Sequence, residues 1–295
     1  MKTIIAATDF SALAGNAVDY AAAVARSTQG KLILFNAYSV PVPGANGLLS
    51  PADYDNFLLH NHERLESKAK AIADTYAIEV ICETSYCSVN PELEALILKY
   101  QADLVVLGME PDSLTQDVFG NTTTALIGNL SCPVLAVPES AGFDGVSRIV
   151  FACDAAQDFP AGSLAKVKVI AEAFRAEVEV FFVEAEAGEL PAAESLLAEE
   201  LKGIVYSYKK LRSDAIIQSI RQETLACGAE LLIMAPKVYG FWSSLFHQSK
   251  TRRMASGLNI PMMALNTNDR APSSYSDETH LIRSLRPESI KAVLE

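Results

Sequence analysis

Short apolar runs alternate with amphipathic stretches along most of the chain. The runs are four to seven residues long, and successive positions within them are apolar, as in strands that are buried on both faces of a parallel sheet. Stretches with helical spacing lie between them, such as residues 13–25. This alternation predicts an α/β fold in which right-handed crossovers place helices on both faces of the sheet.

The same order of segments occurs twice, which indicates an internal repeat. Residues 3–10 open the first half and 148–154 open the second, and an aspartate lies at or near the end of each run (Asp9 and Asp154). The later pairs follow in the same order: strands at 32–36 and 178–183, strands at 78–84 and 204–211, helices at 91–100 and 214–227, strands introduced by Ala-Asp or Ala-Glu at 102–107 and 229–234, and strands opened by proline at 133–137 and 261–265. We therefore predict two tandem, doubly wound, five-stranded parallel sheets.

The repeat sets the expected domain boundaries. We expect a first domain over residues 1–140, a second over 146–267 and a tail over 268–295. A linker at 138–147 contains two glycines, and from about residue 266 Asn, Asp, Ser and Pro replace the apolar pattern. Because single sheets of this kind can pair, we expect the halves to pack face to face as an intramolecular pseudo-dimer, with 133–137 and 261–265 in contact.

Composition and charge narrow the classes of function. Half of the residues are hydrophobic and a fifth are charged, which is globular composition, and the net charge is −12. An acidic surface disfavours nucleic acid as a partner. No apolar run approaches the roughly 18–20 residues of a membrane span, and Asp9 interrupts the first run before any cleavage site. We expect a cytoplasmic protein without a membrane partner.

The cysteines and histidines do not form a metal-binding pattern. The five cysteines are scattered and lack a CxxC pair, so we interpret them as small buried hydrophobes in a reducing compartment. The four histidines lack partners at ligand spacing, and His60 and His62 point in different directions on a helix. We expect no metal site.

Several of these segments, in their order, resemble the universal stress protein family. The resemblance rests on Thr-Asp-Phe-Ser at 8–11, the run 103–108, Gly-Asn-Thr at 120–122 and the run 132–138, with weaker counterparts at 229–234 and 245–265. It spans roughly residues 1–267. It implies a tandem two-domain member with the flavodoxin-like topology that adenine nucleotide alpha hydrolase-like folds share.

Some members of that family bind ATP and others do not. Carried over residue by residue, the resemblance implies that Asp9 and Ala37 contact adenosine. It also implies that a loop after the fourth strand surrounds the phosphates, with Gly108, Gly120, Asn121 and Thr122. Glycines let backbone N–H groups approach phosphate oxygens, and a helix N-terminus adds positive potential. ATP or ADP is the cofactor implied, in the first half only.

The loop also departs from the family pattern, so a second interpretation stays open. Pro111 stands where the second glycine belongs, one residue is missing before Gly120, and Asn121 replaces the hydroxyl residue. Glu110, Asp112 and Asp117 would repel a triphosphate. The loop is either a nucleotide site with altered contacts or a connection that has lost its ligand. Asp9 has a structural alternative as well, as a helix N-cap.

The second half has moved further from the pattern. Ala235 replaces the first glycine, and only Gly240 remains of the loop. Residues 241–246 present three aromatics and a leucine at helical spacing, including Trp242, the only tryptophan. We expect this aromatic segment to be buried within the molecule, with a second copy or another protein as the alternative.

The enzyme classes with recognisable motifs are not indicated. The sequence lacks GxGxxG after the first strand, GxxxxGK[ST] and GxSxG. We therefore expect a non-catalytic protein. Two hypotheses remain: a universal stress protein with ATP or ADP as regulator, or a stress-associated interaction module that has lost nucleotide binding. The expected partners are the chain's own second half, a homodimer partner or an unknown protein.

Overall fold

The computed structural model describes residues 1–38, 51–85, 89–109, 130–154, 162–184, 191–213, 215–235 and 260–265. The aromatic segment 241–246, the loop at 110–129 and the tail at 268–295 lie outside the described residues. Within the ranges just given, no helix is both long and apolar enough to cross a lipid bilayer.

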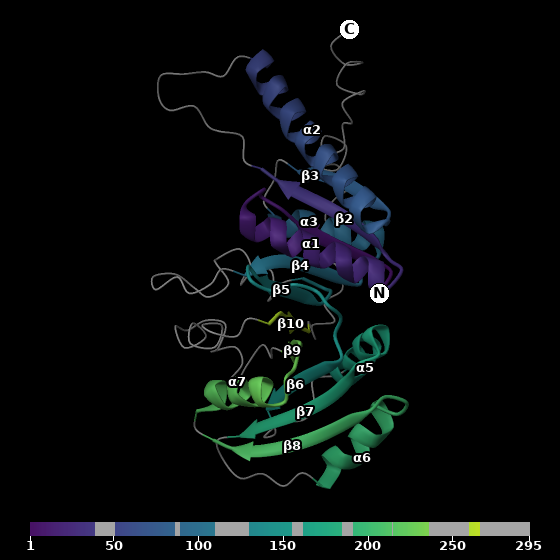
Figure 1. Ribbon diagram of the computed structural model, residues 1–295, viewed down its shortest axis with the longest axis vertical. Coiled ribbons are helices and arrows are strands. Elements are labelled where there is room, and N and C mark those ends of the chain that lie inside the picture. The colour runs from purple at the N-terminus through teal and green to yellow at the C-terminus, as the bar shows by residue number, and fades with distance from the viewer. Residues whose placement is uncertain are drawn as a thin grey trace.

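Strands and helices alternate through both halves (Figure 1). The elements of the first half are β1 (Thr3–Ala7), α1 (Ala12–Ser27), β2 (Lys31–Ala37), α2 (Pro51–Tyr76), β3 (Val80–Ser85), α3 (Val89–Tyr100), β4 (Leu104–Met109) and β5 (Val134–Pro138). Those of the second half are β6 (Arg148–Asp154), α5 (Ser163–Phe174), β7 (Glu177–Glu184), α6 (Pro191–Glu200), β8 (Tyr206–Arg212), α7 (Ile216–Ala226), β9 (Leu231–Met234) and β10 (Met262–Ala264).

The strands form one sheet in the order β3-β2-β1-β4-β5-β10-β9-β6-β7-β8. Each half contributes five parallel strands, and the order within the second half mirrors that of the first. This confirms the predicted α/β class with its doubly wound parallel sheets.

The halves join through the edges of their last strands. β5 and β10 pair antiparallel, with Met263 opposite Leu135. The face-to-face packing expected from the sequence is therefore wrong, although the strands in contact are those it named. An edge strand exposes unpaired backbone N–H and C=O groups, and mutual pairing of the two edges satisfies both sets.

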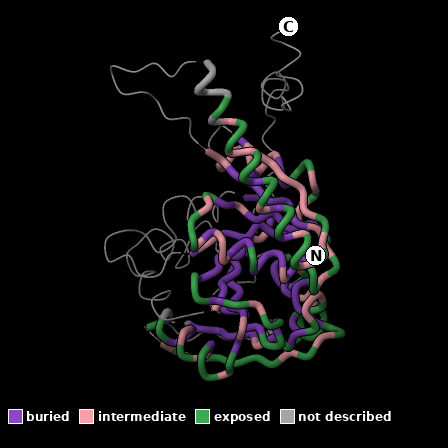
Figure 2. Tube along the Cα trace, turned by 45° about the horizontal axis from the view of Figure 1, so that its top comes forward, coloured by how far each residue is buried: buried purple, intermediate pink, exposed green. Residues whose placement is uncertain are grey.

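The core follows both faces of the sheet (Figure 2). On β2, Leu32 and Leu34 contribute to the face that α1, α2, α5 and α6 cover, while Ile33 and Phe35 contribute to the face of α3 and α7. Alternation of this kind within an apolar run such as residues 32–35 is what a parallel sheet covered on both sides requires.

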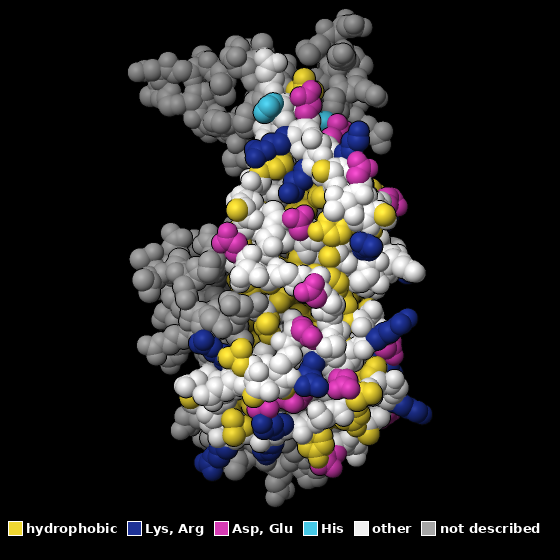
Figure 3. All heavy atoms as spheres, in the orientation of Figure 1, with side chains coloured by type: hydrophobic (Ala, Val, Ile, Leu, Met, Phe, Trp, Pro, Cys, Tyr) yellow, Lys and Arg dark blue, Asp and Glu magenta, His cyan; other side chains and the backbone are white. Residues whose placement is uncertain are grey.

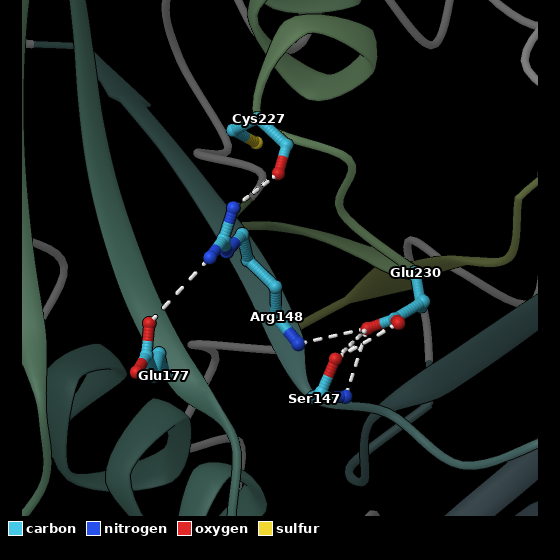
Figure 4. Close-up of polar contacts among 5 residues, drawn as sticks. All are labelled: Ser147, Arg148, Glu177, Cys227 and Glu230. Carbon is cyan, nitrogen blue, oxygen red and sulfur yellow. Dashed lines mark hydrogen bonds and ion pairs between the residues drawn. The ribbon is translucent and has the colours of Figure 1, made fainter.

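An acidic residue just before the fourth strand of each half fixes the start of the first strand. In the first half, Asp103 accepts hydrogen bonds through Oδ2 from the backbone N of Lys2 (2.6 Å) and Thr3 (3.0 Å). In the second half, Glu230 accepts through Oε2 from the backbone N of Ser147 and Arg148, both at 2.8 Å (Figure 4). The repeated Ala-Asp and Ala-Glu of the sequence thus have the same structural role.

Arg148 extends this second contact across the sheet. Its guanidinium donates to the backbone oxygen of Cys227 at 2.6 Å and lies 3.7 Å from a carboxylate oxygen of Glu177 (Figure 4). The beginnings of β6 and β7 and the end of α7 are therefore held together at one end of the second half.

Candidate functional site

The turn between β1 and α1 is held by its own side chains. The backbone N of Phe10 donates to Thr8 Oγ1 (3.0 Å), and that of Ser11 donates to Asp9 Oδ1 (2.9 Å). Ser11 is the N-cap of α1 and accepts from the backbone N of Ala14 (3.1 Å). Phe10 adopts φ +65°, which is rare for a residue with a bulky side chain. Every residue of the Thr-Asp-Phe-Ser motif therefore has a defined conformational role.

Buried polar contacts fasten this turn to β2. The backbone N of Thr8 donates to the Phe35 oxygen (2.8 Å), and Asn36 Nδ2 donates to the Thr8 oxygen (2.6 Å). Asn36 is only 3% exposed, and its Oδ1 finds no donor among the described residues. A buried acceptor without a partner is uncommon in proteins. The end of β2 therefore contains a buried acceptor that has no donor among the described residues.

Asp9 carries a negative charge just after the end of β1. Its side chain is exposed at the beginning of α1. Partial burial raises the pKa of Asp9, but hydrogen bonds from the Ser11 hydroxyl and backbone N–H outweigh it, so the pKa falls below its ordinary value. An ionised carboxylate here also interacts favourably with the positive end of α1. Ser11 is the N-cap, so the capping interpretation of Asp9 is wrong: Asp9 stabilises the turn before the helix by accepting from the Ser11 backbone N.

Three of the six predicted site residues lie at the end of the sheet where its parallel strands finish. Asp9 follows β1, Ala37 ends β2 and Gly108 lies near the end of β4, and both β2 and β4 pair parallel with β1. The carboxyl ends of parallel strands are where open α/β sheets bind ligands. Gly120, Asn121 and Thr122 lie outside the described residues, as do Pro111 and the three loop carboxylates.

Gly108 has a packing reason to be glycine. A Cβ built on it would lie 2.7 Å from Leu13 Cγ and 3.3 Å from the Leu13 backbone carbon. The first turn of α1 therefore approaches β4 too closely for a side chain. Ala235 stands at the corresponding position of the second half, where it is buried within the core. Close packing of α1 accounts for Gly108 without a phosphate.

The interpretation of the cysteines as buried holds for two of them, while Cys227 is half-buried and Cys87 lies outside the described residues. Cys132 and Cys153 are buried, while Cys82 is half-buried. Burial raises the pKa of the Cys132 thiol to about 12. His62 lies 3.1 Å from Glu66 on α2, so its neighbour there is a carboxylate.

The residues that sequence reasoning missed are Asn36 and Phe10. Asn36 is a polar residue inside an otherwise apolar strand, and that break in the pattern is a usable signal. Phe10 belongs to the recognised motif, but nothing in the sequence indicates its left-handed backbone.

Comparisons with known proteins agree with this fold. The model of the universal stress protein family matches residues 1–138, so this part of the chain is a universal stress protein domain. None of the curated proteins matches the sequence.

Solved structures resemble the chain over most of its length. A universal stress protein from Archaeoglobus fulgidus DSM 4304 is 14% identical, with 91% of this chain and 97% of that chain covered and a TM-score of 0.63. A protein of unknown function from Pseudomonas aeruginosa PAO1 is 15% identical, with 90% and 92% covered and a TM-score of 0.54. At these identities the likeness shows the fold, and it extends over both halves.

Proposed function

We propose that this chain is a non-catalytic universal stress protein whose first domain binds an adenine nucleotide, ATP or ADP. The observation that supports it best is that two acceptors, the Asp9 carboxylate and the unsatisfied Oδ1 of Asn36, lie at the ends of two neighbouring strands. Adenine and ribose offer N–H and O–H donors for the Asn36 Oδ1 and for the acceptor capacity that the Asp9 carboxylate keeps beyond its contact with Ser11. The family domain at residues 1–138 agrees with this ligand class.

A binding role fits Asp9 better than a catalytic one. A general base works best when its pKa lies near the working pH, whereas the pKa of Asp9 is lowered. An ionised carboxylate is suited to accepting hydrogen bonds from a ligand that binds and dissociates unchanged. We therefore propose a sensor of nucleotide level in the cytoplasm, with ATP or ADP as regulator.

We propose further that residues 146–267 are a second, degenerate domain of the same family. The repeated strand order and the matching contacts of Asp103 and Glu230 support this. The two domains then act as a pseudo-dimer within one chain, joined through β5 and β10.

The alternative function is an interaction module that has lost its ligand. It is favoured because the family-like residues have structural roles of their own. Gly108 is required by the close approach of Leu13, and Asp9 and Ser11 stabilise the turn before α1. The family-like residues of the first half could then be retained for folding alone.

Calorimetric titration with ATP and with ADP separates the two functions. Asp9→Asn keeps the acceptor for the Ser11 N–H but removes the charge, so we expect nucleotide affinity to fall about tenfold or more, because charge-assisted hydrogen bonds contribute about 1.5–3 kcal/mol. Asp154→Asn is the matched control in the second half and should leave affinity unchanged. Absence of binding at millimolar nucleotide would establish the interaction module instead, and loss through Asp154→Asn would assign the site to the wrong half.

A further inference from the structure

A hollow lies beside the β1–α1 turn. Phe10 forms one wall, and one face of α2 from His60 to Ala71 forms the other. Its volume is about 540 Å³, within the range of small-molecule sites. All of its lining residues belong to the described part of the chain. We call it the α2 hollow.

Two cationic side chains of α2 line this hollow, one helical turn apart. The Arg64 guanidinium carbon lies 4.1 Å from the centre of the Phe10 ring. Lys68 Nζ lies 3.9 Å from the position that a Cβ on Gly15 would occupy, so it reaches α1. Neither cation forms an ion pair with a carboxylate in the described ranges. Figure 3 shows Lys and Arg side chains grouped over α2 with hydrophobic surface between them.

The helix dipole of α1 contributes an unfavourable interaction to Lys68 in the absence of a ligand. Lys68 lies over the first turns of α1, where the helix dipole is positive, and that first turn contains no acidic residue. Glu63 is the one carboxylate among the residues that line the hollow. The ionised Asp9 carboxylate lies just before the same end of α1 and partly offsets this interaction. An anion in the hollow would relieve this repulsion.

The remaining lining residues define the kind of anion. Ser67 adds a hydroxyl donor between the two cations, and Arg64 offers paired N–H groups that match the oxygens of a phosphoryl group. Phe10 adds an apolar surface on which an organic group can pack. A single chloride ion would use neither the volume nor the aromatic wall.

We propose that the α2 hollow is a binding site for the phosphoryl groups of a small phosphorylated molecule, held by Arg64 and Lys68. It does not depend on the nucleotide contacts proposed for Asp9 and Asn36. The phosphoryl groups can belong to a nucleotide seated at those strand ends or to a separate molecule, because the chemistry that recognises them is the same. In either case the cations of α2 take the role for which the acidic loop at 110–129 offers no basic residue.

Calorimetric titration of the full chain with tripolyphosphate at low ionic strength tests the site. The double substitution Arg64→Gln and Lys68→Gln should weaken tripolyphosphate binding at least tenfold. Lys70→Gln is the matched control, because Lys70 is an exposed cation of the same helix outside the hollow, and it should change affinity less than twofold. Equal losses in both variants would reduce the effect to general screening of charge, and absence of tripolyphosphate binding to the unmodified chain would overturn the proposal.

Thermal unfolding provides a second measurement that does not require the variants to bind anything. Lys68→Gln should raise the melting temperature of the ligand-free protein, since it removes a cation from the positive end of α1. Tripolyphosphate should raise the melting temperature of the unmodified protein but not that of the double variant. A lower melting temperature for ligand-free Lys68→Gln would contradict the charge repulsion on which the proposal rests.

Competition between ATP and tripolyphosphate identifies the source of the phosphoryl groups. Mutual displacement, with Asp9→Asn weakening ATP but not tripolyphosphate, would show one nucleotide that spans both places. Simultaneous binding would show a separate phosphorylated ligand. If neither adenosine nor ATP shows binding that depends on Asp9, while tripolyphosphate binding still requires Arg64 and Lys68, the proposed nucleotide function is wrong. The proposal for the α2 hollow is then still supported.

Discussion

Single side chains in this molecule decide how strands begin and how closely helices approach them. Asp103 and Glu230 each collect two backbone N–H groups at the start of a strand, although they differ in length by one methylene. Glu230 also accepts from the Ser147 hydroxyl at 2.9 Å. Such acceptors at a strand start satisfy donors that the sheet itself leaves unpaired.

The contact of Glu230 predicts a pH dependence. Partial burial raises the pKa of Glu230, but the hydrogen bonds from Arg148 and Ser147 lower it more, so it falls below the ordinary value of 4.5. Its contribution to the free energy of unfolding is therefore present above about pH 4.5 and is lost as the pH falls through the lower folded pKa. Denaturant unfolding from pH 6 to pH 3 should show a shallower loss of stability in Glu230→Gln than in the unmodified chain. Parallel curves would contradict the predicted linkage.

Gly108 predicts a steric cost that depends on one neighbour. Because a Cβ would lie 2.7 Å from Leu13 Cγ, Gly108→Ala should lower the free energy of unfolding by about 1–3 kcal/mol. In a Leu13→Ala background the same substitution should cost much less, since the clash is removed. Denaturant unfolding of the four proteins in a double-mutant cycle measures this coupling. Additive effects would show that something other than Leu13 requires glycine.

At the scale of elements, the strands were predictable and the longest helix was not. The central strands β4 and β9 are apolar on both faces, so they were placed to within two residues from the run of hydrophobic positions alone. Among the α2 side chains that the structure describes, the buried ones are Leu65, Ala69 and Ile72, at i, i+4 and i+7 among polar neighbours. A pattern that sparse does not stand out in the sequence. Its 26 residues nevertheless form the outer layer over β2 and β3.

The candidate site was predictable only where it follows a single segment. The family resemblance named Asp9, Ala37 and Gly108, each within a motif or strand end that can be read locally, and the parallel pairing of β1 with β2 and β4 brings them to one end of the sheet. The unsatisfied Asn36 and the α2 hollow depend on contacts between segments that are 28 to about 60 residues apart in the chain, such as Asn36 with Thr8 and Arg64 with Phe10. Local patterns contain no information about those contacts.

At the scale of the whole molecule, two features join the halves. The first is the ladder between β5 and β10, in which Met263 lies fully buried opposite Leu135. The second is the linker, where the Phe143 ring lies 5.2 Å from that of Tyr20 on α1 and 6.1 Å from that of Phe174 on α5. Asn16 of α1 also donates to the Pro138 oxygen at 2.8 Å. The connection between the halves is thus packed against both of them.

This joint predicts that the two halves unfold together. A continuous sheet with a shared core gives each half part of its stability through the other, so hydrogen exchange in β1 and in β6 should report nearly the same opening free energy. Met263→Asp places a charge in the buried ladder and should uncouple them, so that β6 exchanges faster while β1 keeps most of its protection. Leu98→Ala, a substitution at a side chain that is 54% exposed, serves as control and should change neither. Clearly different opening free energies for β1 and β6 in the unmodified chain would mean that the ladder holds the halves side by side without making them one cooperative unit.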